Sequence, residues 1–201
     1  PQNVQNFSLT PISNNIRISW NRNHESDLKN YVLYRSSSSS VNTETEPVFS
    51  TLTDSTYLDT APLSGIYYYF IAAQDIHNNK SPLVAASSPH INLNLTMFIE
   101  GLYDKVSNEQ KSDTVKVSLR NVSSPYSVID SAYGVMSSNG SITTMFGNAP
   151  AGQYYIVITH RNALETWSKS GGENLTPGNS LNYNFTTSSA QSFGNNQKQV
   201  D

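Results

Sequence analysis

Apolar and polar residues alternate with a period of two along the first ninety positions, as in strands with one buried face. Ile16, Ile18 and Trp20 alternate with polar residues, which predicts a strand with one wet face. Residues 31–34 are bulky on both faces, which is typical of a central strand covered on two sides. We therefore predict seven short strands, at residues 4–9, 15–20, 31–34, 47–52, 55–58, 67–73 and 83–87.

The second half repeats the strand pattern with different turns. Residues 92–103 and 114–121 are predicted to pair around a polar hairpin loop, and 128–135 is followed by Asn139-Gly140, a dipeptide that favours tight hairpins. Further strands are predicted at 141–146, 153–160 and 180–186. Because no window of a dozen residues carries a helical apolar stripe, the predicted fold class is all-β, with two tandem β-sandwiches.

Composition narrows the function classes. Charged residues make up only 13%, whereas Ser, Asn and Thr number 31, 23 and 16, so the surface is neutral and polar. The net charge of −3 leaves no basic excess for phosphate, which argues against nucleic acid as a partner. The longest apolar stretches are far shorter than the roughly 20 residues that cross a bilayer, so we expect no membrane insertion. The absence of Cys excludes disulfides and thiolate metal sites.

Several motifs in residues 1–90 resemble a fibronectin type III domain in order and spacing. They are Ile16-x-Ile18-x-Trp20, Asp27-Leu28-x-x-Tyr31-x-Leu33-Tyr34-Arg35, Tyr57-Leu58-Asp59-Thr60 and Tyr67-x-Tyr69-x-Ile71-x-Ala73-x-Asp75. The resemblance implies a structural core that includes Trp20, Tyr31, Tyr67 and Ile71. It also implies that the Tyr67 hydroxyl ties down the corner before its strand.

The order of strands and turns after residue 90, with Ala149-Pro150-Ala151-Gly152 before residues 153–160, resembles the immunoglobulin-like or prealbumin-like Greek-key sandwiches of bacterial surface proteins. The segments 160–168 and 193–196 further resemble C-terminal accessory regions of large secreted bacterial proteins. We predict a fibronectin type III-like domain at 1–89, a second sandwich at 90–187 and a polar C-terminal tail at 188–201. Pro89 is expected to limit the hinge between the two domains.

The sequence offers no recognisable catalytic signature, so we expect no enzyme, no catalytic residues, no metal and no cofactor. The four His residues are widely separated, and three lie in predicted loops or in the linker. Carboxylate pairs are the other route to hydrolysis, but the acidic candidates are isolated or explained by turns. These acidic candidates are Asp27, Asp59, Asp75, Glu100, Asp130 and Glu165.

One segment, residues 160–168, combines several binding chemistries within nine positions. Trp167 offers an apolar ring for stacking on a sugar, and the neighbouring polar side chains offer directional hydrogen bonds. The alternative, which we favour, is that Arg161 pairs with Glu165 and Trp167 plugs the end of the sandwich. The candidate ligand-binding residues are His160, Arg161, Asn162, Glu165 and Trp167.

Three function hypotheses follow. The leading one is a non-catalytic structural, adhesion or spacer module of a bacterial secreted or cell-surface protein, with other domains of a larger parent as partners. Because the chain begins at Pro1 without a signal peptide, we expect a mature or excised extracellular fragment. The second hypothesis is self-assembly of copies into a fibre or surface layer through edge strands or the tail. The third is binding of polysaccharide through Trp167 and its neighbours.

Overall fold

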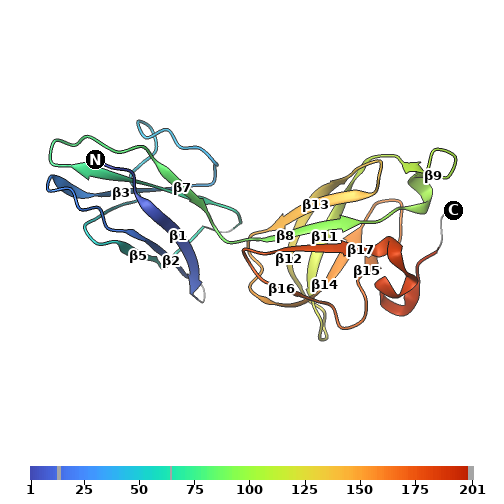
Figure 1. Ribbon diagram of the computed structural model, residues 1–201. Helices are drawn as coiled ribbons and strands as arrows, with labels where there is room; N and C mark the ends of the chain where they lie inside the picture. The colour runs from blue at the N-terminus through green and yellow to red at the C-terminus, as the bar shows by residue number, and fades with distance from the viewer. Residues whose placement is uncertain (13–14, 64, 199–201) are drawn as a thin grey trace. The chain divides into compact units, whose positions relative to one another are not determined.

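The protein is described by a computed structural model covering residues 1–12, 15–63 and 65–198 (Figure 1). The chain forms two compact units, Pro1–Pro89 and His90–Asp201. Both are built of strands packed as β-sandwiches, which confirms the predicted all-β fold class. Among the described residues, no helix is long and apolar enough to cross a membrane.

The described residues of the first unit form seven strands in two antiparallel sheets. One sheet has the order β1 (Gln5–Ile12), β2 (Asn15–Asn21), β5 (Thr56–Asp59). The other has the order β4 (Ser50–Leu52), β3 (Leu28–Ser36), β6 (Tyr68–Asp75), β7 (Val84–Ser87). As expected for a central strand, β3 lies between β4 and β6.

The core of this unit lies between the two sheets. Trp20, Tyr31, Tyr67 and Ile71 are all buried in it, and the rings of Trp20 and Tyr31 meet edge to face with centroids 5.2 Å apart. The other face of β3 and β6 is also covered, because Val32, Tyr34 and Phe70 form a second buried cluster. Both faces of the central strand are therefore buried, which accounts for its lack of polar alternation.

The tyrosine that anchors the strand corner differs from the one expected by resemblance. The hydroxyl of Tyr69, not that of Tyr67, donates to the Asp59 carboxylate, which also receives Arg35 Nη1 at 2.6 Å and the Ala61 N–H at 2.9 Å. Burial, and then the bond to Asp59, raise the pKa of Tyr69. Arg35 and Tyr69 face each other in the β3–β6 ladder, so strand register creates this cluster.

The second unit contains two larger sheets. One has the order β12 (Val128–Met136), β11 (Asp113–Asn121), β14 (Gly152–Thr159), β15 (Thr166–Trp167), and β16 (Glu173–Leu175) also pairs with β14. The other has the order β13 (Ser141–Phe146), β8 (Ile91–Thr96), β17 (Ser180–Asn184), and β17 runs parallel to β8. A short hairpin joins β9 (Tyr103–Asp104) to β10 (Glu109–Gln110).

Two predicted pairings in this unit are wrong. The strand from residue 91 pairs with β13 and β17, whereas β11 pairs with β12 and β14 in the other sheet. The Asn139-Gly140 turn likewise carries the chain from β12 in one sheet to β13 in the other, without a ladder between them. A Cβ on Gly140, whose φ is +79°, would lie 2.6 Å from the Met97 carbonyl oxygen. The Met97 N–H donates to the Gly140 carbonyl oxygen at 3.0 Å, so this end of the turn continues the pairing of β8 with β13.

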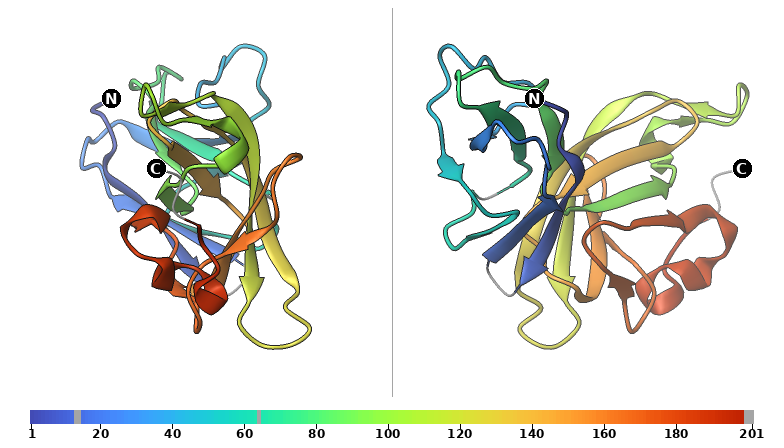
Figure 2. Two further views of the ribbon diagram at one scale, coloured as in Figure 1. Left: turned by 90° about the vertical axis from the view of Figure 1, so that its right-hand side faces the viewer. Right: turned by 60° about the vertical axis from the view of Figure 1, so that its left-hand side comes forward.

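The predicted polar tail, 188–201, is described as far as residue 198, and residues 199–201 lie outside the described residues. Residues 188–198 follow η2 (Phe185–Thr187) with two further 3-10 turns, η3 (Ser189–Gln191) and η4 (Phe193–Asn195), drawn in red in Figure 2. Ser192 is buried and forms a bridge with Ser168, and the Gln191 carbonyl accepts the Tyr183 hydroxyl at 2.7 Å. This segment is therefore polar in composition and nevertheless packs against the second sandwich.

Candidate functional site: a strand-end cluster and an aromatic patch

His160 and Arg161 lie just beyond the end of β14, where both approach the Asp113 carboxylate at the start of β11. The His160 side chain is buried, and its Nδ1 accepts the Asn162 backbone N–H at 3.2 Å. Its Nε2 lies 3.3 Å from Asp113 Oδ2 without the alignment of a hydrogen bond. Arg161 Nη2 lies 2.6 Å from the same oxygen.

Asp113 is the centre of this strand-end cluster. The hydrogen bond from the Thr114 backbone N–H, followed by the nearby imidazole of His160 and the charge of Arg161, holds the pKa of Asp113 below its usual value. The expected pair between Arg161 and Glu165 is absent, because Arg161 binds Asp113 instead. The Asp113 carboxylate and the Arg161 guanidinium neutralise one another, and the contacts of Asp113 with His160 and Arg161 hold the end of β14 against the start of β11.

Glu165 and Trp167 lie outside this cluster, on a different surface. Glu165 Oε1 accepts the indole N–H of Trp167 at 2.6 Å, and its Oε2 lies 3.7 Å from Arg120 Nη2. Trp167 pairs with Val157 in the β14–β15 ladder and is half-buried on the outer face of the sheet. Asn162 contributes its backbone N–H to His160, and its side chain is exposed. The structure thus divides the five candidate residues between two places.

Around Trp167 lies an aromatic patch, which we define as Arg120, Tyr126, Tyr155, Trp167 and Phe193. The Trp167 ring meets those of Tyr155 and Tyr126 at centroid distances of 5.3 and 5.9 Å, and Phe193 meets Tyr155 at 5.8 Å. The Arg120 guanidinium carbon lies 5.3 Å from the centroid of the Trp167 ring. Arg120 and Tyr155 face each other across the β11–β14 ladder, so strand register assembles the patch.

Sequence reasoning missed Asp113 and four members of this patch. The signal for Arg120 and Tyr155 lay in the period of two, because Leu119 and Tyr154 point to the core and their neighbours point outward. Tyr126 lies in the loop before β12 with a φ of +57°, and Phe193 lies in the segment expected to be a tail. No local pattern marked these last two residues as neighbours of Trp167.

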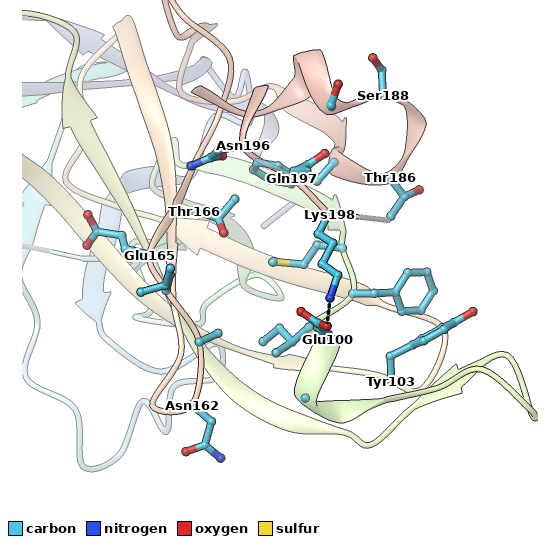
Figure 3. Close-up of a pocket in the computed structure, with 18 of the residues that line it drawn as sticks. Glu100, Tyr103, Asn162, Glu165, Thr166, Thr186, Ser188, Asn196, Gln197 and Lys198 are labelled. Carbon is cyan, nitrogen blue, oxygen red and sulfur yellow. Dashed lines mark hydrogen bonds and ion pairs between the residues drawn. The ribbon is translucent and has the colours of Figure 1, made fainter. Parts of the chain in front are cut away.

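A separate open groove lies at one end of the second unit. Its volume is about 1190 Å³, and it is lined mainly by residues 97–103, 162–166 and 185–198. Figure 3 shows Lys198 reaching Glu100 inside the groove, whereas the labelled side chains of Asn162 and Glu165 point away from its middle. The groove therefore contains one satisfied ion pair and little convergence of polar groups. The described residues include no group of three His, Asp or Glu placed to hold a metal ion.

Comparisons with known proteins place little constraint on function. A scan against protein-family models and a search of curated proteins each found no match. Among solved structures, the chain is similar to pectate lyase PelI from Erwinia chrysanthemi in complex with tetragalacturonic acid, at 20% identity and a TM-score of 0.35, over 42% of this chain and 28% of that one. It is also similar to BcpA, the major pilin subunit of Bacillus cereus, at 14% identity and a TM-score of 0.28, over 85% of this chain and 63% of that one. A variant of the same pilin matches at 12% identity and a TM-score of 0.26, over 89% and 65%.

The chain thus spans about a quarter of the lyase and less than two thirds of the pilin. TM-scores of this size do not establish a shared function.

Proposed function

We propose that this chain is a non-catalytic structural or adhesion module of a bacterial secreted or cell-surface protein, in which a fibronectin type III-like sandwich precedes a second sandwich. One observation carries the proposal: five of the six acidic candidates, Asp59, Asp75, Glu100, Asp130 and Glu165, are held by structural partners inside their own units, as is Asp113. A carboxylate that caps a turn or closes an ion pair is not available to activate water or protonate a leaving group.

In the first unit, the acidic groups close turns and corners. Asp75 accepts the backbone N–H groups of His77 and Asn79 and the Asn79 side-chain amide, each at 2.9 Å. The Asn79 side-chain amide is the largest of the effects that lower the pKa of Asp75. Asp59 is buried and holds Arg35, Tyr69 and the Ala61 N–H. Both carboxylates therefore stabilise a turn or a corner of the first unit.

In the second unit the same is true of four further carboxylates. Asp130 accepts the Asn148 N–H at 2.9 Å, which ties β12 to the loop before β14. Glu100 pairs with Lys198, and Glu165 bonds the Trp167 indole. Asp113 holds the strand-end cluster with Arg161. Each of these contacts joins chain segments that are distant in sequence or shape a loop.

The finer assignment of the first unit to fibronectin type III rests on its residue pattern and strand order. Seven strands divide three and four between the sheets, with Trp20 on the second strand and the tyrosine run at the sixth. The second unit, with one parallel strand pair, fits a less regular accessory sandwich. Each unit has its own hydrophobic cluster, as a module in a longer chain of domains requires.

The test is a hydrolysis screen of the purified protein against peptides and neutral and acidic glycans, with products detected by mass spectrometry. We expect no product above that formed by buffer alone. Turnover that disappears in Asp113→Asn or Glu165→Gln, while circular dichroism shows both variants folded at the assay temperature, would overturn the proposal. Turnover that survives in every carboxylate variant identifies a contaminating enzyme, and the proposal then stands.

A further inference from the structure

We propose that the aromatic patch, together with the outer face of β11 beside it, binds a carboxylate-bearing polysaccharide. The surface lies on the side of the β12-β11-β14-β15 sheet that faces away from the core. This inference goes beyond the proposed function, which assigns the module no ligand and no binding surface. It also differs from the binding hypothesis drawn from sequence, since His160, Arg161 and Asn162 take no part.

Arg120 is the polar centre of this surface, and most of its hydrogen-bonding capacity is unused. A guanidinium has five N–H donors in a planar fork. Arg120 Nη1 lies 3.5 Å from the Tyr126 carbonyl oxygen and Nη2 lies 3.7 Å from Glu165, both at the long limit of useful contact. Its Nε is buried without an acceptor. A planar carboxylate from outside, bound by two parallel hydrogen bonds to Nη1 and Nη2, would satisfy these two donors better than the groups now within reach.

The exposed rings of the patch lie at its rim. Tyr126 and Phe193 are 43% and 48% exposed, large fractions for aromatic side chains, whereas Tyr155 is buried and forms the floor. Arg120 covers a face of the Trp167 ring, so Trp167 supports the patch and does not offer an open platform. The apolar face of a sugar ring can stack on Tyr126 or Phe193 while its carboxylate reaches Arg120 between them.

The same outer face continues along β11 and carries positive charge. Lys116 is four residues before Arg120, about 13 Å along the strand, and pairs with Tyr133, which is 74% exposed. Among the described residues, no acidic strand residue points to this face from β11 or β14, and Glu165 flanks it. The face therefore has a small positive excess on a chain whose net charge is −3. This local sign favours an acidic ligand over a neutral one.

The geometry favours a glycan over a peptide. An extended peptide gains most of its affinity by adding to a sheet edge through backbone hydrogen bonds, whereas this surface is a sheet face. Ser131 and Thr159 lie on either side of β11 on this face and offer exposed hydroxyls to the many hydroxyl groups of a sugar chain. Aromatic rings, hydroxyls and spaced cations on one open face suit a long acidic polysaccharide.

Affinity gel electrophoresis of the whole chain tests the proposal with two matched polymers. Carboxymethylcellulose and hydroxyethylcellulose share one glucan backbone, and only the first carries carboxylates. We expect carboxymethylcellulose to retard the protein and added NaCl to weaken the retardation, with at least tenfold weaker binding of hydroxyethylcellulose. Arg120→Gln should weaken carboxymethylcellulose binding about 10- to 100-fold, and Phe193→Ala should also weaken it, because each removes one of the two contacts.

Arg161→Gln is the matched control, because Arg161 is an exposed arginine in the same unit that pairs with Asp113 outside the patch. It should bind carboxymethylcellulose as the parent does. Arg120→Lys keeps the charge but loses the fork, and should fall between parent and Arg120→Gln. Thermal unfolding of each variant verifies its fold. If Arg120→Gln does not fold, the binding of carboxymethylcellulose by Phe193→Ala still tests the patch.

Three results would overturn the proposal. Equal affinity for the two polymers would remove the role of the carboxylate. Loss of binding in Arg161→Gln but not in Arg120→Gln would move the site to the strand-end cluster. The third result is that neither polymer retards the protein. If light scattering then shows a dimer that Phe193→Ala abolishes, the face joins two copies of the chain and does not bind polysaccharide.

Discussion

Replacing Tyr69 by Phe tests the buried polar cluster that closes the first sandwich. The substitution keeps the ring, which is fully buried and contacts Tyr67 and Phe49, and removes only the hydroxyl that donates to Asp59. Asp59 keeps Arg35 Nη1 at 2.6 Å and the Ala61 N–H at 2.9 Å. The carboxylate therefore stays paired, and the loss is that of one hydrogen bond to a charged acceptor.

The magnitude follows from that single bond. A hydrogen bond to a charged group contributes about 1.5–3 kcal/mol to folding. In a domain of this size, each kcal/mol shifts the melting temperature by roughly 4–8 °C, so Tyr69→Phe should lower it by roughly 6 to 24 °C. Asp59→Ala should cost more, about 3–5 kcal/mol, because it leaves the mostly buried Arg35 guanidinium without its partner.

The chain offers a clean assay, since it has two tryptophans and one lies in each unit. In a Trp167→Phe background, the fluorescence of the buried Trp20 reports unfolding of the first unit alone in urea. Tyr67→Phe is the matched control, because resemblance assigns the corner hydroxyl to Tyr67 and the structure assigns it to Tyr69. If Tyr67→Phe costs as much free energy as Tyr69→Phe, or if Tyr69→Phe costs less than about 0.5 kcal/mol, the assignment to Tyr69 is refuted.

Three further predictions concern the second unit. Gly172→Ala should destabilise it by about 1–3 kcal/mol more than Gly171→Ala, since both glycines have positive φ but only at Gly172 would a Cβ meet a backbone oxygen, at 2.6 Å. Equal costs in urea unfolding would contradict the contact. The depressed pKa of Asp113 stabilises the fold above the ordinary Asp pKa of about 3.9, and this contribution is lost as pH falls through the folded-state value. The stability difference between parent and Asp113→Asn should therefore shrink in acid unfolding series below about pH 4, and a constant difference would refute the ion pair. Ending the chain after Thr187 should lower the thermal midpoint of the second unit only, and an unchanged midpoint would show that the C-terminal turns do not contribute.

The first sandwich could be predicted almost strand by strand, because its signals are local. Alternation at Ile16, Ile18 and Trp20 identifies the buried face of β2, and turn-forming residues bound each strand. The identity of the anchoring tyrosine could not be predicted in this way. Tyr67 and Tyr69 share a face and differ by two positions, so the choice depends on which hydroxyl reaches Asp59 across the sandwich.

In the second sandwich the longer strands could be located, although the first ends at Thr96 and not at Tyr103, whereas the short strands β15 and β16 and the strand partners could not be predicted. An Asn-Gly turn at Asn139 and Gly140 is compatible with a hairpin and also with a crossing between sheets, because both need the same left-handed backbone. The choice depends on the Met97 carbonyl, which approaches Gly140 from a strand some forty residues earlier. Likewise, nothing local shows that the strand after His90 pairs in parallel with the last strand, β17.

At the candidate site, too, local sequence identifies the segment but does not predict which residues its side chains contact. Residues 160–168 stand out by composition, and sequence spacing alone suggests that Arg161 and Glu165 pair. The structure separates them because the two residues lie in the connection between β14 and β15, which turns at His160, whose carbonyl oxygen accepts the Ala163 N–H at 3.2 Å. Arg161 turns to the start of β11, while Glu165 reaches the outer face and its neighbour Arg120. Since β11 supplies Asp113 at its first position and Arg120 seven residues later, the register of one strand decides which arginine meets which carboxylate. A shift of one residue in that register would turn the Arg120 side chain into the core and remove the aromatic patch. The proposed binding surface therefore depends directly on the pairing of β11 with β14.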